Sequence, residues 1–380
     1  MESIDDKVSV LNSLITACID RHAPLRRVKV MRPPAPWIHS EEIRVLQAER
    51  NQLRTKAHDD YTQESWLAFR TVQNKIKAVI SQTKRAFLST TLSSKRPKEV
   101  WRVIHQVLNP SPQPLRIDPN NLNIHFATTT ERTLGTKPDD TNELLGLVDS
   151  LPMQSGVTFC LMPVSHNQIN KELKELRSDS STGADQIPVR FIKSVANDLA
   201  SPLTHIINAC IETSTFLLLW KIVRISPISK VELPVGENDF CPVSILPALS
   251  KILERLVLRQ LITFIEKAAL FGHCMSGFRK GHSTTTALIG IRDDLKRSMN
   301  RGEVSLMVFA DYSKAFDTVR FSSALKKMHC LGFSGSFSKW MINYLSDRRH
   351  FVQIDDRCSD MAHVAFGVPQ GSILGPVIFN

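Results

Sequence analysis

Apolar positions recur every three to four residues over several stretches of the chain, and this spacing predicts amphipathic helices. In the stretch that starts at about Gln63, these positions are Trp66, Phe69, Val72, Ile76, Val79, Ile80 and Phe87. In the stretch before it, Ser40 can cap a helix whose first turn carries Glu41 and Glu42, the charge sign that the helix dipole favours. Together the two stretches predict a helical hairpin.

From residue 163 onward, helical and strand-like patterns alternate. Helices are predicted after Ser165, over PLTHIINACIETS, and over LSKILERLVLRQLITFIEKA, where Ser250 can act as the cap. WKIVRISPISK predicts a short strand. The apolar, β-prone residues 306–310 predict a buried strand, followed by a helix from about Ser313. Residues 109–162 are rich in Pro, Asn, Thr and Asp, which predicts a linker or an irregular arm.

The composition is that of a folded protein. With 380 residues, 42% of them hydrophobic, the chain is long enough for two or three domains. No apolar run is long enough to span a bilayer, and MESIDDKVSV has acidic residues where a signal peptide carries positive charge. We therefore expect an intracellular protein, in the nucleus or the cytoplasm. The seven cysteines form no CxxC pair, which favours reduced thiols.

The positive charge is concentrated in residues 21–102, which hold 18 Lys and Arg against seven acidic residues. This excess equals the net charge of the whole chain, +11. A local basic excess is the electrostatic signature of a polyanion-binding region, with nucleic acid as the first candidate. A solvated helical surface has the same composition, and charge alone does not separate the two interpretations.

One acidic residue stands at a position typical of ligand sites. Asp311 ends the apolar run in FADYSKAFDTV, and a carboxylate at the end of a central strand faces the crevice where ligands of open sheets bind. Magnesium prefers such hard oxygen ligands. Considered alone, an aspartate there is more often a helix cap or a turn residue.

FADYSKAFDTV and GVPQGSILGPVIFN together resemble the first two palm motifs of reverse transcriptases from non-LTR (LINE-type, jockey-like) retrotransposons. The resemblance continues upstream in family order, through SGFRKGHSTTTAL, CPVSILPALSKILERLVLRQL, WKIVRISPISK and PVSHNQINKELKELRSDSSTGADQIP. It covers roughly residues 160–380. More loosely, residues 1–110 resemble the spacer between the endonuclease and polymerase parts of such elements.

The resemblance implies an α+β fold of the right-hand polymerase type. Its expected parts are a basic helical spacer region (1–108), a Pro/Asn-rich linker or arm (109–162), a fingers portion (163–300) and a partial palm (301–380). The implied chemistry is RNA-templated DNA synthesis by two-metal nucleotidyl transfer. An RNA template, a DNA primer and dNTPs would be the partners, and Mg²⁺ the cofactor.

The family also implies roles for single residues. Asp311 matches the catalytic, metal-binding aspartate of the first motif, and the backbone carbonyl of Tyr312 matches a further metal ligand. The nucleotide-binding positions match Lys230, Phe316, Gln370 and Gly371, of which Phe316 would exclude a ribose 2′-hydroxyl. The template-binding positions match Arg279, Lys280 and His282. Ordinary interpretations remain for several of them: a surface lysine at 230, a core phenylalanine at 316 and a Gly-Pro turn around Gly371.

The chain departs from the family pattern in ways that bear on activity. Cys241 replaces an arginine that contacts the triphosphate, STGADQIP keeps Asp185 but lacks a proline and a glycine, and FLLLW replaces FPxxW. The [FY]ADD motif, which carries two further carboxylates, does not occur in these 380 residues. Because one carboxylate cannot hold two cations, we expect this chain to be a truncated fragment that does not polymerise. The alternatives are a non-catalytic nucleic-acid-binding protein that uses residues 21–102, and a relic without function.

Overall fold

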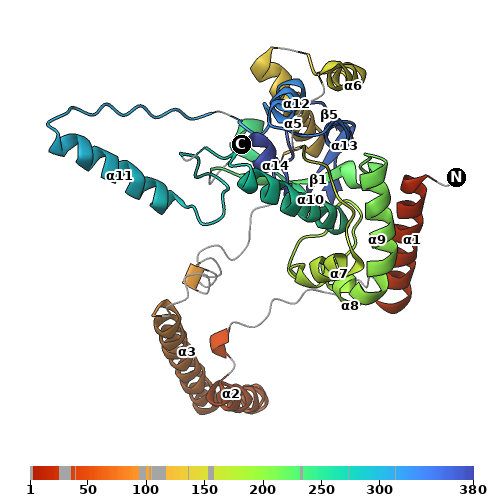
Figure 1. The fold of residues 1–380 in the computed structure, drawn as a ribbon. Coiled ribbons are helices and arrows are strands. Elements are labelled where there is room, and N and C mark those ends of the chain that lie inside the picture. Colours follow the sequence, from red (N-terminus) through yellow and green to blue (C-terminus); the bar gives the residue numbers. More distant parts are fainter. Residues whose placement is uncertain are drawn as a thin grey trace. The chain divides into compact units, whose positions relative to one another are not determined.

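The computed structural model describes residues 3–24, 36–38, 40–93, 100–101, 104, 117–135, 137–152, 158–231, 234–272, 274–312 and 314–380. These residues fall into two compact units, one of residues 1–24 with 116–380 and the other of residues 25–115 (Figure 1). The predicted region 1–108 is therefore not one unit. Its first helix, α1 (Ile4–His22), packs on α9 (Ala196–Glu212) of the larger unit. None of the described helices is long and apolar enough to cross a membrane.

The smaller unit is the predicted helical hairpin of α2 (Glu41–Asp60) and α3 (Gln63–Leu92). The Ser40 side chain accepts the Ile43 N–H at 3.3 Å, so the predicted cap is confirmed. A short 3₁₀ turn, η1 (Pro36–Ile38), also contacts α3. The cations expected at residues 26–32 and 95–102 lie outside the described residues.

A small mixed sheet lies in the larger unit. Its order is β2-β1-β3-β4, and β5 also pairs with β3. The strands are β1 (Ile222–Ser229), β2 (Phe240–Ile245), β3 (Arg348–Ile354), β4 (Arg357–Cys358) and β5 (Ala362–Val364). β1 runs antiparallel to β2 and parallel to β3. The predicted strand in WKIVRISPISK and the mixture of helix and sheet are confirmed.

Most of the larger unit is helical (Figure 1). Besides α1 and α9, its helices include α7 (His166–Glu175), α8 (Val189–Ser194), α10 (Ala248–Lys267), α11 (Thr284–Asn300), α12 (Phe321–Cys330), α13 (Gly335–Leu345) and α14 (Gly375–Phe379), with short turns η2 (Leu218–Lys221) and η3 (Glu237–Asp239). Ser165 caps α7 as predicted. The predicted cap Ser250 is wrong, because α10 starts at Ala248 and Ser250 is buried within it.

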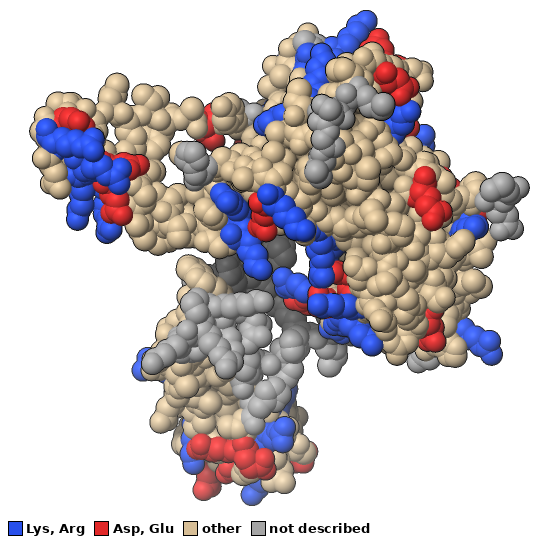
Figure 2. Space-filling view, viewed as in Figure 1, with Lys and Arg blue, Asp and Glu red and all other residues tan. Residues whose placement is uncertain are grey.

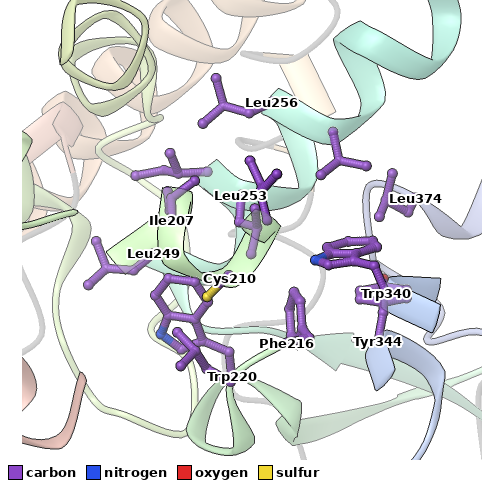
Figure 3. Packing of buried hydrophobic residues seen from close by; sticks show 14 of the residues in the cluster. Ile207, Cys210, Phe216, Trp220, Leu249, Leu253, Leu256, Trp340, Tyr344 and Leu374 are labelled. Carbon is purple, nitrogen blue, oxygen red and sulfur yellow. The ribbon is translucent and has the colours of Figure 1, made fainter. Parts of the chain in front are cut away.

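Aromatic side chains from separate elements meet in the core of the larger unit (Figure 3). The rings of Trp340 and Tyr344 stack at 5.5 Å, and Phe216 meets Tyr344 edge-on at 5.0 Å. Leu249 and Leu253 of α10 are buried in the same cluster. This core fixes α13, and with it β3, against α10.

The predicted linker is wrong for residues 117–152, which form α5 (Pro119–Leu134) and α6 (Thr141–Ser150). Asp118 caps α5, Pro119 fits its first turn, and Asp140 caps α6, so the residue types that suggested a loop start helices here. α5 packs on β3 and β5, and α6 packs on α13.

The predicted buried strand at residues 306–310 is also wrong. Residues 303–312 form no strand, and the side chains of Val308 and Phe309 are both 82% exposed. Turns occupy residues 314–318, and the next helix starts at Phe321 rather than near Ser313, which lies outside the described residues. β-propensity produces a strand only where a neighbouring strand accepts its hydrogen bonds, and no described strand pairs with this run.

Candidate functional site

The two motif segments, far apart in sequence, are joined by backbone hydrogen bonds. The Gly367 N–H donates to the Val319 carbonyl at 3.2 Å, and the Val368 N–H donates to the Phe316 carbonyl at 2.9 Å. Gly367 has φ +74°, and a Cβ there would lie 2.6 Å from the Phe316 carbonyl oxygen. Only glycine permits this close approach, which holds the second motif against the turn of the first.

Gly371 fixes the second motif to the sheet. The Ser244 N–H of β2 donates to the Gln370 carbonyl at 2.8 Å. Gly371 has φ +121°, and a Cβ on it would overlap the carbonyl oxygen of Ser244. A glycine is therefore required by its contact with β2.

A buried carboxylate accepts a backbone hydrogen bond from the same segment. Glu254 of α10 is fully buried and accepts the Ile373 N–H at 2.5 Å. Burial raises the pKa of Glu254, whereas the nearby Arg348 charge and the N–H groups of Ile373 and Leu374 lower it. Glu254 therefore holds the backbone just after Gln370 and Gly371 and before α14.

A cavity of about 270 Å³ lies beside these segments. It is lined by residues of α5, β1, η3, β2, the 314–317 turn, β3, β5 and the 366–370 loop, and by Lys230, which follows β1. Cys241 and Gln370 are among the lining residues. The Cys241 thiol lies 3.7 Å from Gln370 Oε1. Lys230 Nζ donates to the Asn238 carbonyl at 3.0 Å. Two residues predicted to bind nucleotide, Lys230 and Gln370, thus meet at one cavity.

The cavity carries an excess of positive charge. Of its described lining residues, Lys230, Lys314 and Arg349 are cationic and Asp317 is acidic. Arg348 also lines the cavity, but its guanidinium lies over the rings of Phe216 and Tyr344. Burial raises the pKa of Asp317, and the charges of Lys314 and Lys230 oppose this rise. Burial lowers the pKa of His350 to about 4, so this lining histidine is neutral near pH 7. Such a cavity suits an anionic ligand.

Phe316 does not line this cavity. Its ring stacks on Phe379 at 5.3 Å and meets Phe278 edge-on at 5.9 Å. Its position matches the ordinary interpretation of a packing side chain. The predicted role in excluding a 2′-hydroxyl stays a prediction.

The predicted template residues lie elsewhere in the larger unit. The Arg279 guanidinium lies over the Phe271 ring, 5.3 Å from its centre. Lys280 and His282 are exposed. Exposed polar side chains are available to a polyanion, but no contact of these residues identifies a template.

Asp311 and Tyr312 are both exposed, at the end of the extended run. Neither lines the cavity. Across the described part of the chain, no group of three or more His, Cys, Asp or Glu residues is placed to hold a metal ion. The described residues therefore do not by themselves fit a magnesium site around Asp311, and we derive no step through a metal.

Sequence reasoning missed several residues of the cavity. Lys314 and Asp317 lie within FADYSKAFDTV, and the position of this motif could have marked them. Thr129 and Thr130 of α5 carried no such signal, because their segment was interpreted as a linker. Only the packing of α5 on the sheet brings them to the site.

Comparison with known proteins decides the family. Residues 229–380 match the family described as "Reverse transcriptase (RNA-dependent DNA polymerase)". These residues belong to the reverse transcriptase family. The reverse transcriptase domain thus contains the β1–β2 connection, both motif segments and most of the cavity. α5 and the start of β1 precede the matched range yet line the same cavity, so upstream residues complete it.

Three relatives of this reverse transcriptase domain come from mobile elements of Drosophila melanogaster. The "RNA-directed DNA polymerase from mobile element jockey" is 28% identical over 58% of this chain and 24% of its own length. The "Probable RNA-directed DNA polymerase from transposon BS" is 28% identical over 61% of this chain and 26% of its own length. The "Probable RNA-directed DNA polymerase from transposon X-element" is 23% identical over 100% of this chain and 43% of its own length. The predicted relationship to non-LTR retrotransposon reverse transcriptases is confirmed. The chain spans less than half the length of these relatives.

Proposed function

We propose that the basic cavity binds a deoxynucleoside triphosphate and that the domain serves RNA-templated DNA synthesis. The observation that carries this proposal is the meeting of Lys230 and Gln370, from separate motifs, at one cavity of net positive charge. The names of the relatives, RNA-directed DNA polymerases, support the reaction. An RNA template and a DNA primer would be the other partners.

The residues of the cavity have distinct parts in this proposal. The Lys230 ammonium would bind the triphosphate, since a cation gives a charge-assisted hydrogen bond to phosphate oxygens. Gln370, held by Gly371 against β2, would lie beside the nascent base pair. Cys241 supplies only a weak donor where the family has an arginine, so we expect modest affinity.

Nucleotide binding tests the proposal directly. Titration of the full chain with dTTP and Mg²⁺ should show saturable binding, and Lys230→Gln should weaken it at least about tenfold. Lys326→Gln is the matched control, because Lys326 is exposed on α12 and does not line the cavity. Equal loss in both variants, or no saturable binding, would contradict the proposal.

The two-metal reaction and the expected inactivity of residues 1–380 stay predictions. The family resemblance assigns Mg²⁺ ligands to Asp311 and the Tyr312 carbonyl, and the chemistry needs further carboxylates. Primer extension on an RNA template should therefore give no product with this chain alone. Nucleotide incorporation that disappears in Asp311→Ala would show that the expectation of inactivity is wrong.

A second candidate function is nucleic-acid binding by the α2/α3 hairpin. Arg70, Lys77 and Lys84 follow one another at seven-residue intervals, which places them in one row along α3. None of the described acidic residues forms an ion pair with them. In α11, by contrast, basic and acidic side chains are interleaved (Figure 2), with the pair Arg297–Asp294 at 3.3 Å.

Salt dependence of RNA binding tests this second function. If the row contacts three phosphates, changing all three residues to Gln should reduce the slope of log affinity against log salt by about 2. The control is the triple change Arg292, Arg297 and Arg301 to Gln, which removes the same charge from α11 and the residue after it. An equal change in slope for both triple variants would mean that the row on α3 does not contact more RNA phosphates than the α11 arginines do.

A further inference from the structure

We infer that Lys314 is a second polyphosphate-binding residue of the cavity, which acts on the nucleotide together with Lys230. This inference rests on the proposed nucleotide function and names a residue to which the family resemblance gave no role. Lys314 lies in the turn of the first motif, and Lys230 follows β1. The two lysines reach the same cavity from segments more than eighty residues apart.

The backbone of Lys314 is held in one conformation. It has φ +55°, in the left-handed region that side chains other than Gly, Asn and Asp rarely adopt. Its carbonyl accepts the N–H groups of Asp317 at 2.9 Å and Thr318 at 3.1 Å. The next residues, Phe316 to Val319, receive the hydrogen bonds from Gly367 and Val368. The turn that carries the Lys314 side chain is thus anchored to the motif that carries Gln370.

Electrostatics places the two ammonium groups in one neighbourhood. Burial raises the pKa of Asp317, and the charges of Lys314 and Lys230 lower it. Burial and the Arg132 charge lower the pKa of His125, as do the charges of Lys314 and Lys230, whereas the Glu237 charge raises it. Asp317 is the acidic residue among the described lining residues. Two cations that share one partly buried carboxylate leave positive charge for a ligand with several negative groups.

The shape of the site favours a nucleotide over a nucleic-acid strand. A cavity of about 270 Å³ lies near the lower end of the range of small-molecule pockets. Strand phosphates instead follow open basic grooves. A polyphosphate places adjacent charges within a few ångströms of one another, which two convergent ammonium groups can bind together. Lys314 would in this way supply the second cation that Cys241 does not.

The test compares two nucleotides with three variants of the full chain. For Lys314→Gln, we expect dTTP with Mg²⁺ to bind at least about tenfold more weakly, while dTMP affinity changes less than about threefold. Lys314→Arg, which keeps the charge, should retain dTTP affinity to within about threefold. Lys326→Gln should match the wild type for both nucleotides. A thermal unfolding scan of each variant reports whether the fold is intact.

The outcomes separate this inference from the proposed function. If dTTP binds the wild type and Lys230→Gln weakens this binding, but the dTTP affinity of Lys314→Gln equals that of Lys326→Gln, the inference is wrong and the proposed function stands. If Lys314→Gln weakens dTTP and dTMP equally, or weakens binding of single-stranded RNA instead, the residue does not bind the polyphosphate and the inference is again wrong. If the wild type binds no dTTP, both fail.

Discussion

Gly371 offers the sharpest test of how the second motif is held. In Gly371→Ala, the new Cβ would overlap the Ser244 carbonyl oxygen, and the backbone at φ +121° would become strained. Strain at such a position costs about 1–3 kcal/mol. Relief of the overlap by movement would break the Ser244–Gln370 backbone hydrogen bond, at about 0.5–1.5 kcal/mol more. We therefore expect a loss of about 1.5–4.5 kcal/mol in the free energy of unfolding.

Urea unfolding of Gly371→Ala, followed by circular dichroism, measures this loss. Gly146→Ala is the control, because Gly146 lies in α6 with open space around its Cβ position. Alanine favours a helix over glycine by about 0.5–1 kcal/mol, so this control should be as stable as the wild type or more so. If Gly371→Ala is also as stable as the wild type, the segment is not held against β2 in the way described.

Three further changes test the surroundings of the site. Glu254→Ala leaves the Ile373 N–H without its buried acceptor and should cost about 1–3 kcal/mol in urea unfolding. Glu175→Ala, at the half-exposed pair with Arg259, should cost less than about 1 kcal/mol. Burial raises the pKa of Asp185 from 3.8 in the unfolded chain to about 6 in the folded chain. The folded chain therefore binds the carboxyl proton more tightly, and ionisation of Asp185 destabilises the fold as the pH rises from about 3.8 to about 6. Asp185→Asn should therefore stabilise by up to about 3 kcal/mol near neutral pH and by only about 1 kcal/mol near pH 4.5, and a pH-independent effect would refute this reasoning. Cys241→Arg should tighten dTTP binding about tenfold, and an unchanged affinity would mean that position 241 does not reach the phosphates.

Local patterns predicted the elements whose sequence signal is complete in itself. The hairpin of α2 and α3, the cap at Ser165 and the strand β1 all appear where periodicity and capping residues placed them. Lys230 and Gln370, which the motif resemblance assigned to nucleotide binding, line one cavity, and their role stays a prediction. These features depend on neighbouring residues or on spacing within a motif, which the sequence displays directly.

The features that failed depend on distant partners. Residues 303–312 have a strand composition, yet a strand exists only with a paired neighbour. α5 has a loop-like composition, yet its Asn123 side chain donates to the Asp360 carbonyl at 2.8 Å and its Thr130 hydroxyl to the Asp317 carbonyl at 2.7 Å. Polar residues that form hydrogen bonds to a distant segment look like loop residues in the sequence. For this reason the sequence did not predict that α5 lines the cavity.

Titration of the full chain with dTTP and Mg²⁺ tests the central claim most directly, with wild type, Lys230→Gln and Lys326→Gln side by side. We predict saturable binding that weakens at least about tenfold in Lys230→Gln and stays unchanged in Lys326→Gln. Absence of saturable binding, or equal affinity of the two variants, would contradict the claim that this cavity is the nucleotide site of the reverse transcriptase domain.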